Sequence, residues 1–470
     1  MSALRRPRPD ALAAWIRGQR WFAAKTRRIE AVGWDDWIPL AGAGIALVSV
    51  RLDDGGLHRY AIPLAGPPAG EVTDAFADAG FCRVLLESVA RRVRLRSEGG
   101  GTLQGDTTTE FAGRPPAPSE VRVLAGEQSN TSVVFGEHNI LKFFRRLTTG
   151  INPEREITQF LTERTPFAHS PRLLGALEYR GPDGGESTLA VLQEFVAGGR
   201  DGWRWTLEQV GELYDRARGS GPGADVDRAR AWARTSLAAL RRLGELTAAL
   251  HRALGSRSDD PAFAPETITA DDVAAWAAAV RGQVEQARHL LGDDARLAEV
   301  PGVAARLAAL VGWQKIRHHG DFHLGQTLYR DRLGDFVILD FEGEPLRPLA
   351  ERRRKHTPLR DVAGMLRSID YAATFAPGRS ADLEPWADVW AAEASRQFLA
   401  GYREGSGAAG FLPASEDDFR RAVAVFELEK AAYEVVYEAN HRPQWMAVPA
   451  RGLLRAAARL GSPPSAAAEG

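Results

Sequence analysis

The sequence predicts an α+β fold in which a strand-rich part is followed by a helical part. Short apolar runs bounded by turn residues dominate residues 121–198, which predicts β-strands there. Alanine-rich stretches with apolar residues at helical spacing dominate from residue 203 onward, which predicts long amphipathic helices. A proline-rich segment over residues 111–120 separates a further N-terminal unit from these two parts.

With 470 residues the chain is too long for one hydrophobic core, so about two or three domains are expected. The composition changes described above place the boundaries near residues 115 and 198. We therefore predict an N-terminal domain over residues 1–115, a β-rich domain over 116–198 and a helical domain over 199–470.

The composition excludes several classes of protein. There are 60 basic and 61 acidic residues, and this balance argues against nucleic acid or an anionic membrane as a partner. The single cysteine, Cys82, allows no intrachain disulfide and is consistent with a reducing compartment. No uninterrupted apolar run approaches about 20 residues and no apolar segment follows the N-terminus, so we expect a soluble cytoplasmic protein.

The first 110 residues carry no pattern typical of catalysis. We expect a helix over residues 12–21, strands over 38–52 and 58–63, and a helix over 76–93. The cluster Gln19-Arg-Trp-Phe-Ala-Ala-Lys25 is typical of a helix end packed by aromatic rings, and a docking surface is the alternative.

The β-rich part places a lysine in an unusual position. Strands are expected over residues 121–124, 133–135 and 140–144, and Lys142 lies in the middle of the third. Burying a lysine in an apolar strand is unfavourable unless its charge is paired. Asn152-Pro153 is a good start for a helix, which would supply Glu156 as the partner. A lysine–glutamate pair of this kind positions nucleotide phosphates in kinases, whereas a solvent-facing strand lysine is the simpler alternative.

Two further segments of this part are candidates for nucleotide binding. The polar loop that ends in Ser129-Asn-Thr-Ser132 offers hydroxyls and backbone N–H groups that could cover phosphates. The apolar strand over 189–196 lies where the hinge of a kinase would run. There the backbone around Gln193, Glu194 and Val196 would hydrogen-bond an adenine.

The helical part contains several long amphipathic segments. We expect helices over residues 203–217, 226–254, 271–291, 304–315, 358–371, 386–402 and 418–439. Arg360 and Arg367, at the start of and within the 358–371 helix, are candidates for holding nearby catalytic carboxylates in place.

The candidate catalytic and metal-binding residues lie within residues 317–344. Asp321 lies in a polar loop, and a loop carboxylate can orient a hydroxyl and accept its proton. Asp340 follows the apolar strand 336–339, and Gln326 lies between the two acids. Carboxylate and amide oxygens are ligands that Mg²⁺ prefers. A single aspartate at a strand end is usually a turn former or a helix cap, so the combination rather than any one residue indicates a magnesium site.

The helix predicted over 418–439 carries aromatic and charged residues on one stripe. Lys430, Tyr433 and Tyr437 follow each other at i, i+3 and i+4 offsets. Such a stripe suits a sugar, which offers hydroxyls to bond and apolar ring faces to stack. An ordinary polar helix face explains the same pattern equally well.

His319-Gly-Asp-Phe-His-Leu-Gly-Gln326 together with Asp340-Phe-Glu342 resembles the catalytic loop and metal-binding motif of aminoglycoside-phosphotransferase-like kinases. That group usually has Asn where this chain has Gln326. The wider set of motifs resembles the actinobacterial maltokinases, which phosphorylate maltose at its reducing end with ATP. The motifs that carry this resemblance are Gln19-Arg-Trp-Phe-Ala23, Glu127-Gln-Ser-Asn-Thr-Ser-Val-Val-Phe135, Ile140-Leu-Lys-Phe-Phe-Arg-Arg146, Gly150-Ile-Asn-Pro153, Asp340-Phe-Glu-Gly-Glu-Pro345, Pro358-Leu-Arg-Asp-Val-Ala-Gly364, Tyr371-Ala-Ala373 and residues 430–445.

The resemblance implies a protein-kinase-like bilobal fold, with an N-terminal cap domain that has a cystatin-like sheet, a β-rich small lobe and a helical large lobe. It implies ATP and Mg²⁺ as cofactors and a sugar as acceptor. Asp321 would be the catalytic base, and Lys142 and Glu156 would position the phosphates. The implied metal ligands are Gln326, Asp340 and Glu342, and the implied sugar-site residues are His323, Lys430, Tyr433 and Glu438.

The motifs allow three other functions. The sister group of glucosamine kinases resembles this chain in the cap, in Gly320-Asp-Phe-His323 and in Asp201-Gly-Trp-Arg-Trp205. An inactive kinase-like subunit that binds an enzyme of trehalose or glycogen metabolism is a second alternative, although the intact Lys142, Asp321 and Asp340 argue against it. An antibiotic-modifying phosphotransferase is a third, and the basic run 347–355 has the wrong sign for polycationic substrates.

Overall fold

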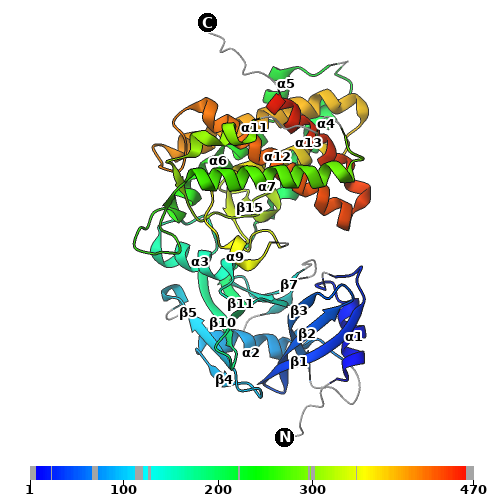
Figure 1. The fold of residues 1–470 in the computed structure, drawn as a ribbon, viewed down its shortest axis with the longest axis vertical. Helices are drawn as coiled ribbons and strands as arrows, with labels where there is room; N and C mark the ends of the chain where they lie inside the picture. Colours follow the sequence, from blue (N-terminus) through cyan, green and yellow to red (C-terminus); the bar gives the residue numbers. More distant parts are fainter. Residues whose placement is uncertain are drawn as a thin grey trace. The chain divides into compact units, whose positions relative to one another are not determined.

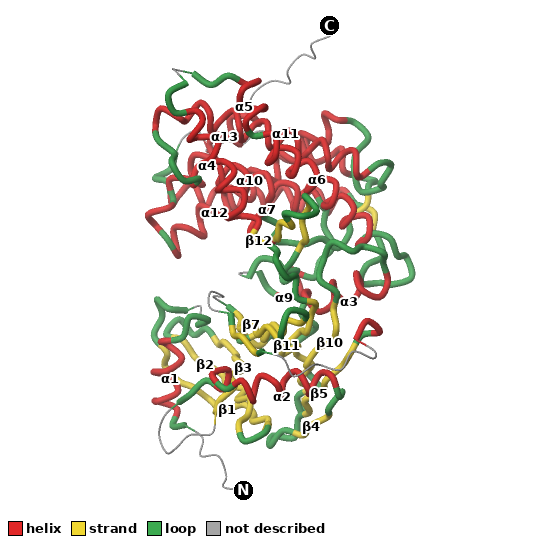
Figure 2. The backbone as a smooth tube through the Cα atoms, turned by 180° about the vertical axis from the view of Figure 1, so that it is seen from behind, coloured by secondary structure: helices red, strands yellow, loops and turns green. Residues whose placement is uncertain are grey.

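The computed structural model describes residues 7–461 except 23, 66–71, 112–119, 125–128, 221–222, 295–296, 298–301 and 346. The chain divides into two compact units, Met1–Gly198 and Gly199–Gly470 (Figure 1). Strands predominate in the first unit and helices in the second (Figure 2). The α+β class predicted from the sequence is confirmed.

The first unit begins with a helix on an antiparallel sheet. Helix α1 (Pro9–Gly18) buries Leu12 and Ile16 in a core shared with the sheet. The sheet has the order β1-β2-β3-β9 and consists of β1 (Ile29–Leu40), β2 (Ala43–Leu52), β3 (Leu57–Ala65) and β9 (Arg146–Leu147). The single strand predicted over 38–52 is wrong, because Ala41 and Gly42 both have positive φ and form a turn between β1 and β2.

A second, larger sheet completes this unit. Its order is β4-β5-β10-β11-β8-β7-β6, formed by β4 (Arg94–Arg96), β5 (Thr102–Thr107), β10 (Leu173–Arg180), β11 (Glu186–Glu194), β8 (Asn139–Phe144), β7 (Asn130–Phe135) and β6 (Val121–Val123). Helix α2 (Ala79–Ala90) packs on β5 and β10. The helix predicted over 76–93 is shorter than expected, because a 3₁₀ turn over Ala75–Ala77 precedes Asp78, whose side chain caps α2 through the Gly80 N–H.

The large sheet joins strands from both sides of residue 115. Strands β4 and β5 precede this position and β6 to β11 follow it. Most of the predicted proline-rich linker, residues 112–119, lies outside the described residues. The division of this unit into two domains at residues 115 and 116 stays a prediction.

Helix α3 (Pro153–Arg164) begins where the sequence predicts. Asn152 caps it by accepting a hydrogen bond from the Glu154 N–H at 2.8 Å, and Pro153 occupies the first helical position. The helix packs against β10 and β11, so its acidic first turn lies close to the large sheet.

The second unit is a helical assembly with two small sheets. Its helices are α4 (Gly202–Ala217), α5 (Val226–Trp232), α6 (Arg234–Leu254), α7 (Ala270–Leu290), α8 (Val303–Leu307), α9 (Leu349–Arg352), α10 (Leu359–Phe375), α11 (Glu384–Ser406), α12 (Glu416–His441) and α13 (Ala447–Gly461). The sheets are β12-β15-β16, from Arg200–Asp201, Thr327–Arg330 and Asp335–Ile338, and β13-β14, from Glu266–Thr267 and Gln314–Lys315.

The helices of the second unit pack closely against one another. Helices α6 and α11 approach through glycine, and a Cβ on Gly244 would lie 2.1 Å from the Phe398 carbonyl oxygen. Helix α12 packs against α7, α10 and α13. None of the helices within the described ranges is both long enough and apolar enough to cross a membrane.

Two helix predictions for this unit are wrong in length. The helix predicted over 226–254 breaks at Ala233, where ψ of 12° leaves the helical region. The helix predicted over 304–315 ends at Leu307 and is followed by a 3₁₀ turn over Ala308–Leu310. Gly312 then adopts φ of 91°, which leads into β14. Helix α13 was not predicted.

Candidate active site

The loop that contains Asp321 is held by a buried aspartate on α10. The His319 N–H donates to Asp361 Oδ2 at 2.7 Å, and the Gly320 N–H donates to Oδ1 at 2.9 Å. His251 Nε2 on α6 lies 3.0 Å from the same carboxylate, and its Nδ1 lies 2.9 Å from the Tyr402 hydroxyl. The backbone beside Asp321 is thus fixed by helices distant in sequence.

The charge of Asp361 is maintained by these contacts. Burial opposes ionisation, but the interactions with His318 and His251 outweigh it and hold the pKa of Asp361 well below its usual range. Arg360 and Arg367 were predicted to hold the catalytic carboxylates in place. In the structure Arg360 donates to Glu429 and Arg367 donates to Glu434. Asp361 lies in the motif Pro358-Leu-Arg-Asp-Val-Ala-Gly364, but the sequence analysis predicted no such role for it.

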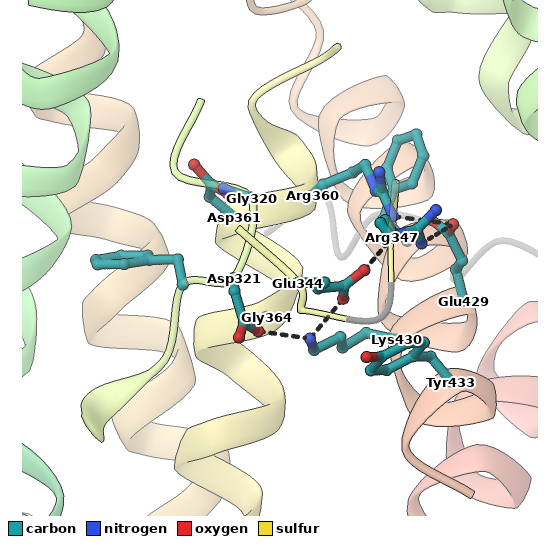
Figure 3. Close-up of a pocket in the computed structure, with 12 residues that line it drawn as sticks. Gly320, Asp321, Glu344, Arg347, Arg360, Asp361, Gly364, Glu429, Lys430 and Tyr433 are labelled. Carbon is teal, nitrogen blue, oxygen red and sulfur yellow. Dashed lines mark hydrogen bonds and ion pairs between the residues drawn. The ribbon is translucent and has the colours of Figure 1, made fainter. Parts of the chain in front are cut away.

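Asp321 lies against a lysine from the far end of the chain. Lys430 Nζ on α12 is 3.0 Å from Asp321 Oδ1 and 2.7 Å from Glu344 Oε1 (Figure 3). The side chains of Asp321, Lys430 and Glu344 are 19%, 17% and 4% exposed, so the contacts are largely shielded from water. Lys430 Nζ also lies over the Tyr433 ring, 4.9 Å from its centroid.

Glu344 links this lysine to a pair of arginines. It also bonds Arg347, and Arg347 and Arg360 both contact Glu429. Burial opposes the charge of Glu344, but Lys430 and Arg347 outweigh it and lower the pKa of Glu344 to about 2. In the same way Glu344 and Asp321 raise the pKa of Lys430 above its usual value despite burial. Glu344 and Lys430 are therefore both ionised at neutral pH.

These side chains surround a pocket in the second unit. It is lined by Gly320, Asp321, Phe322, Glu344, Arg347, Arg360, Asp361, Gly364, Phe426, Glu429, Lys430 and Tyr433 (Figure 3). Gly364 is required here, because a Cβ at this position would lie 2.6 Å from the Phe322 carbonyl oxygen. The loop of Asp321 can therefore lie directly on α10.

The four predicted sugar-site residues fall into two groups. Lys430 and Tyr433 line the pocket. The His323 ring accepts a hydrogen bond from the Gly325 N–H at 3.1 Å, and burial lowers the pKa of His323. Glu438 is buried and bonds Arg442 at 2.7 and 2.9 Å. The structure does not include His323 or Glu438 in the pocket wall.

The predicted metal ligands lie at the end of the β15–β16 hairpin. The Leu339 N–H donates to the Gln326 carbonyl oxygen at 2.9 Å, which places Gln326 beside the residue before Asp340. The Leu339 carbonyl oxygen in turn lies 2.8 Å from His319 Nε2. Asp340 has φ of 62°, in the left-handed region, and lies two residues beyond β16 rather than at its last position.

This arrangement fits a magnesium ion that binds together with phosphates. Among the described residues, no three His, Cys, Asp or Glu side chains form a group that could hold a metal ion unaided. Mg²⁺ in nucleotide sites is usually bound by one or two carboxylates and by the substrate phosphates. Asp340, Glu342 and the amide oxygen of Gln326 supply that kind of donor set.

The nucleotide candidates lie in the first unit, where strand register decides their orientation. Lys142 on β8 pairs with Ser132 on β7 and with Val191 on β11, so these three side chains share one face of the sheet. Thr131 belongs to the opposite face, where its hydroxyl accepts from Arg145 Nε at 2.9 Å. Asn130 shares the Lys142 face, whereas Ser129 precedes the strand and is exposed.

Glu154 of α3, rather than the predicted Glu156, contacts the face of the large sheet on which Lys142 lies. Gln193, two positions from Val191 on β11, donates from Nε2 to Glu154 Oε1 at 2.8 Å. Glu154 is buried, whereas Glu156 is half-buried and points about 200° further round the helix. The alternation of β11 together with the helix start at Asn152 could have identified Glu154 from the sequence.

The predicted hinge segment uses part of its backbone within the unit. The Glu194 N–H donates to the Arg172 carbonyl oxygen at 3.0 Å, and the Phe195 N–H donates to the His138 carbonyl oxygen at 2.7 Å. Because these two N–H groups already donate within the unit, adenine binding by this segment would have to use the Glu194 carbonyl group and Val196.

Comparison with known proteins places this geometry in a family. A family model described as the maltokinase N-terminal cap domain matches residues 15–78. A glucosamine kinase of Streptacidiphilus jiangxiensis is 31% identical over 428 residues, which cover 87% of this chain and 87% of that protein. The chain belongs to the glucosamine kinase family. The resemblance to maltokinases drawn from the sequence is confirmed by the match of the cap domain, and the glucosamine kinases named as their sister group are confirmed as relatives.

A second relative and a solved structure are also glucosamine kinases. A glucosamine kinase of Mycolicibacterium smegmatis (strain ATCC 700084 / mc(2)155) is 27% identical over 422 residues, which cover 85% of this chain and 95% of that protein. A structure of glucosamine kinase in complex with glucosamine, ADP and inorganic phosphate superposes with a TM-score of 0.65 and 27% identity, covering 90% of this chain and 93% of that chain. The predicted kinase-like fold with an N-terminal cap is confirmed, and the family is one of phosphotransferases with an alcohol group as acceptor.

Proposed function

We propose that this protein is an ATP-dependent kinase that phosphorylates maltose at its reducing end to maltose 1-phosphate. The observation that carries the proposal is the contact between Asp321 and Lys430. An ammonium group lies against the carboxylate that would meet the acceptor, which suits an uncharged sugar hydroxyl. The resemblance of residues 430–445 to maltokinases points the same way.

The acceptor side of the reaction would use Asp321 as the catalytic base. The sugar hydroxyl oxygen attacks the γ-phosphorus of ATP, and the bond from that phosphorus to the bridging oxygen breaks, so ADP leaves. Asp321 orients the hydroxyl and accepts its proton. Lys430 and Asp361 support this role, the first through the carboxylate and the second through the loop backbone. Tyr433 offers a ring face on which a sugar can stack.

The nucleotide side would use the predicted phosphate-binding and metal-binding residues. Lys142 would position the phosphates, held by Glu154 or by the originally predicted Glu156. Ser129, Asn130, Thr131 and Ser132 would cover the phosphates with hydroxyl and backbone groups. Gln326, Asp340 and Glu342 would hold Mg²⁺, which would neutralise the charge that develops on the phosphates. Most of the rate enhancement would come from positioning and charge stabilisation.

Glucosamine is the second candidate acceptor, because two relatives and a solved structure of similar fold carry that name. Phosphorylation would then give glucosamine 6-phosphate. A third candidate is an inactive subunit that binds an enzyme of trehalose or glycogen metabolism, and such an enzyme is also a candidate partner of the active kinase. Co-migration of the two proteins in gel filtration would test that partnership.

An ADP-release assay with ATP and Mg²⁺ tests the proposal. Maltose, glucose, glucosamine and kanamycin would be compared at equal concentrations, with Asp321→Asn as the inactive control. We expect turnover with maltose well above the other acceptors. Turnover with glucosamine alone would keep the kinase assignment and overturn the acceptor. Absence of turnover despite ATP binding would favour the binding subunit.

A further inference from the structure

A pocket of the first unit is lined by the start of the motif Gln19-Arg-Trp-Phe-Ala-Ala-Lys25, for which a docking surface is one of the two predicted roles. We infer that this pocket binds a small organic carboxylate with an apolar or aromatic body. Such binding is independent of the proposed kinase activity. Three features of the wall point to this ligand: two buried donors without partners, one surplus positive charge and an apolar surface.

The pocket lies entirely within the first unit and has a volume of about 350 Å³, which is typical of small-molecule sites. Its wall consists of the segment after α1, the 3₁₀ turn Ala75–Ala77, Asp74, the end of β6, the start of β7 and Arg145. The Thr131 hydroxyl contacts Arg145 on the side of the large sheet opposite Lys142. The pocket is therefore separate from the sheet face on which Lys142 lies.

Arg145 is a buried guanidinium with one nitrogen left over. Its side chain is 2% exposed, Nη2 donates to Asp74 Oδ2 at 2.6 Å, and Nε donates to the Thr131 hydroxyl at 2.9 Å. Among the described residues, Nη1 has no hydrogen-bond partner. Burial lowers the pKa of Arg145, and the contact with Asp74 opposes this change without cancelling it. A second anion would therefore be favourable beside this guanidinium.

Trp21 carries a second donor of the same kind. Trp21 is 6% exposed, and its indole Nε1 finds no acceptor in the part of the chain that the structure describes. The Arg145 guanidinium lies 5.4 Å from the centroid of the Trp21 ring, so the two donor groups are neighbours. Neither an indole nor a guanidinium has an acceptor atom, so the missing partner must be an acceptor. The two oxygens of one carboxylate suit two such donors.

The charge of the wall favours a monoanion. Arg20 is exposed, Arg145 is buried, and Asp74 is the acid of the described pocket wall. Two arginines and one aspartate leave one positive charge in excess. One carboxylate balances this charge, whereas the dianion of a phosphate ester exceeds it. The wall also contains the apolar side chains that an aromatic body would contact, namely Trp21, Phe76, Val123 and Leu124.

The experiment measures the Kd of benzoate for the full-length protein by NMR titration at constant ionic strength, with benzamide as its uncharged counterpart. A ligand of this size should bind with a Kd of about 1 mM. Benzamide should bind about fivefold more weakly or worse, because it lacks the charge. Absence of benzoate binding up to about 20 mM, or equal binding of benzamide, would overturn the inference.

Two variants locate the site. Trp21→Phe removes the indole N–H but keeps a ring, and Arg20→Glu reverses the exposed charge of the wall. Each should raise the Kd of benzoate by about fivefold or more, through a lost hydrogen bond in the first case and repulsion in the second. Arg20→Glu should leave the Kd of benzamide within about twofold of the wild type, since benzamide is uncharged.

Trp15→Phe and Arg17→Glu are the matched controls. Trp15 packs against Trp21, with ring centroids 5.9 Å apart, but lies outside the pocket wall. Arg17 is exposed on α1 and also lies outside the wall. Both controls should leave the Kd of benzoate within about twofold of the wild type. The same Kd in Trp21→Phe, Arg20→Glu and the wild type would place benzoate elsewhere and overturn the inference.

Thermal melts followed by circular dichroism separate loss of the site from loss of the fold. The Trp21 Nε1 has no hydrogen bond to lose in the free protein, so Trp21→Phe should keep a cooperative melt. Arg20 is exposed, so Arg20→Glu should fold in any case. If Trp21→Phe does not fold, Arg20→Glu decides alone, and a Kd of benzoate equal to that of the wild type overturns the inference.

Discussion

The sheet of the first unit and the pocket of the second unit each hold a half-buried lysine, but they assemble its surroundings differently. Lys142 meets residues on strands directly paired with its own, Ser132 and Val191. Lys430 meets Asp321 and Glu344, which are 109 and 86 positions away in the sequence. The nucleotide side is therefore built by strand register, and the acceptor side by the packing of distant helices and loops.

The largest effect should come from the acceptor side. Asp321→Asn removes the group that accepts the proton, so kcat should fall by about 10³-fold while ATP affinity stays within about twofold. Steady-state kinetics and calorimetry check the two statements. Asp331→Asn, an exposed aspartate that contacts Arg200, is the control and should retain activity. Near-wild-type turnover in Asp321→Asn would remove Asp321 from the proposed role.

Asp361→Ala tests whether the acceptor side depends on long-range packing. The substitution leaves two backbone N–H groups and His251 without their buried acceptor, so the free energy of unfolding should fall by about 3–5 kcal/mol. Asp388→Ala removes a half-exposed contact with Arg455 and should cost less than about 1 kcal/mol. Urea denaturation measures both. Equal losses in the two variants would contradict the central position given to Asp361.

Asp340→Asn tests the metal assignment. Asn tolerates the left-handed backbone of this position, so the change removes charge without adding strain. Affinity for ATP in the presence of Mg²⁺ should fall by about tenfold or more, since a carboxylate ligand is lost. Affinity measured without Mg²⁺ should change little. An unchanged calorimetric affinity with Mg²⁺ would contradict metal binding by Asp340.

On the nucleotide side, a pair of substitutions on α3 decides which glutamate supports Lys142. Glu154→Gln should raise the KM for ATP by about tenfold, because a charge-assisted contact on the Lys142 face is lost. Glu156→Gln should change it by less than about twofold. Kinetics at saturating maltose provide the comparison. The reverse order of effects would restore Glu156 as the partner.

The smallest effect is the pH dependence of stability contributed by Glu344. Its pKa is lowered to about 2 in the folded protein from 4.5, so the stabilisation is fully present above about pH 4.5 and is lost as the pH falls towards 2. The difference in melting temperature between wild type and Glu344→Gln should therefore be constant near neutral pH and should shrink below about pH 4. A difference that stays constant down to about pH 2.5 would show that Lys430 and Arg347 do not hold the charge of Glu344.

Much of the fold followed from local patterns in the sequence. The cap of α3 by Asn152, the position of Lys142 within β8 and the apolar strand before Asp340 all depend on neighbours a few positions away. The wrong helix ends followed from backbone features with a weak local signal. Ala233 is an example, because alanine usually continues a helix, yet its ψ of 12° ends α5.

The sequence by itself determined the class of the protein, the α+β kinase-like fold with a cap, and the loop in which Asp321 and Gln326 lie. Only the tertiary structure decided that Asp321 rests on Lys430 and Glu344, that Asp361 holds the loop, and that Glu154 lies on the Lys142 face. The reason is physical. Strand alternation and helix capping act over a few residues, whereas the pairing of buried charges depends on which distant segments the hydrophobic core brings together.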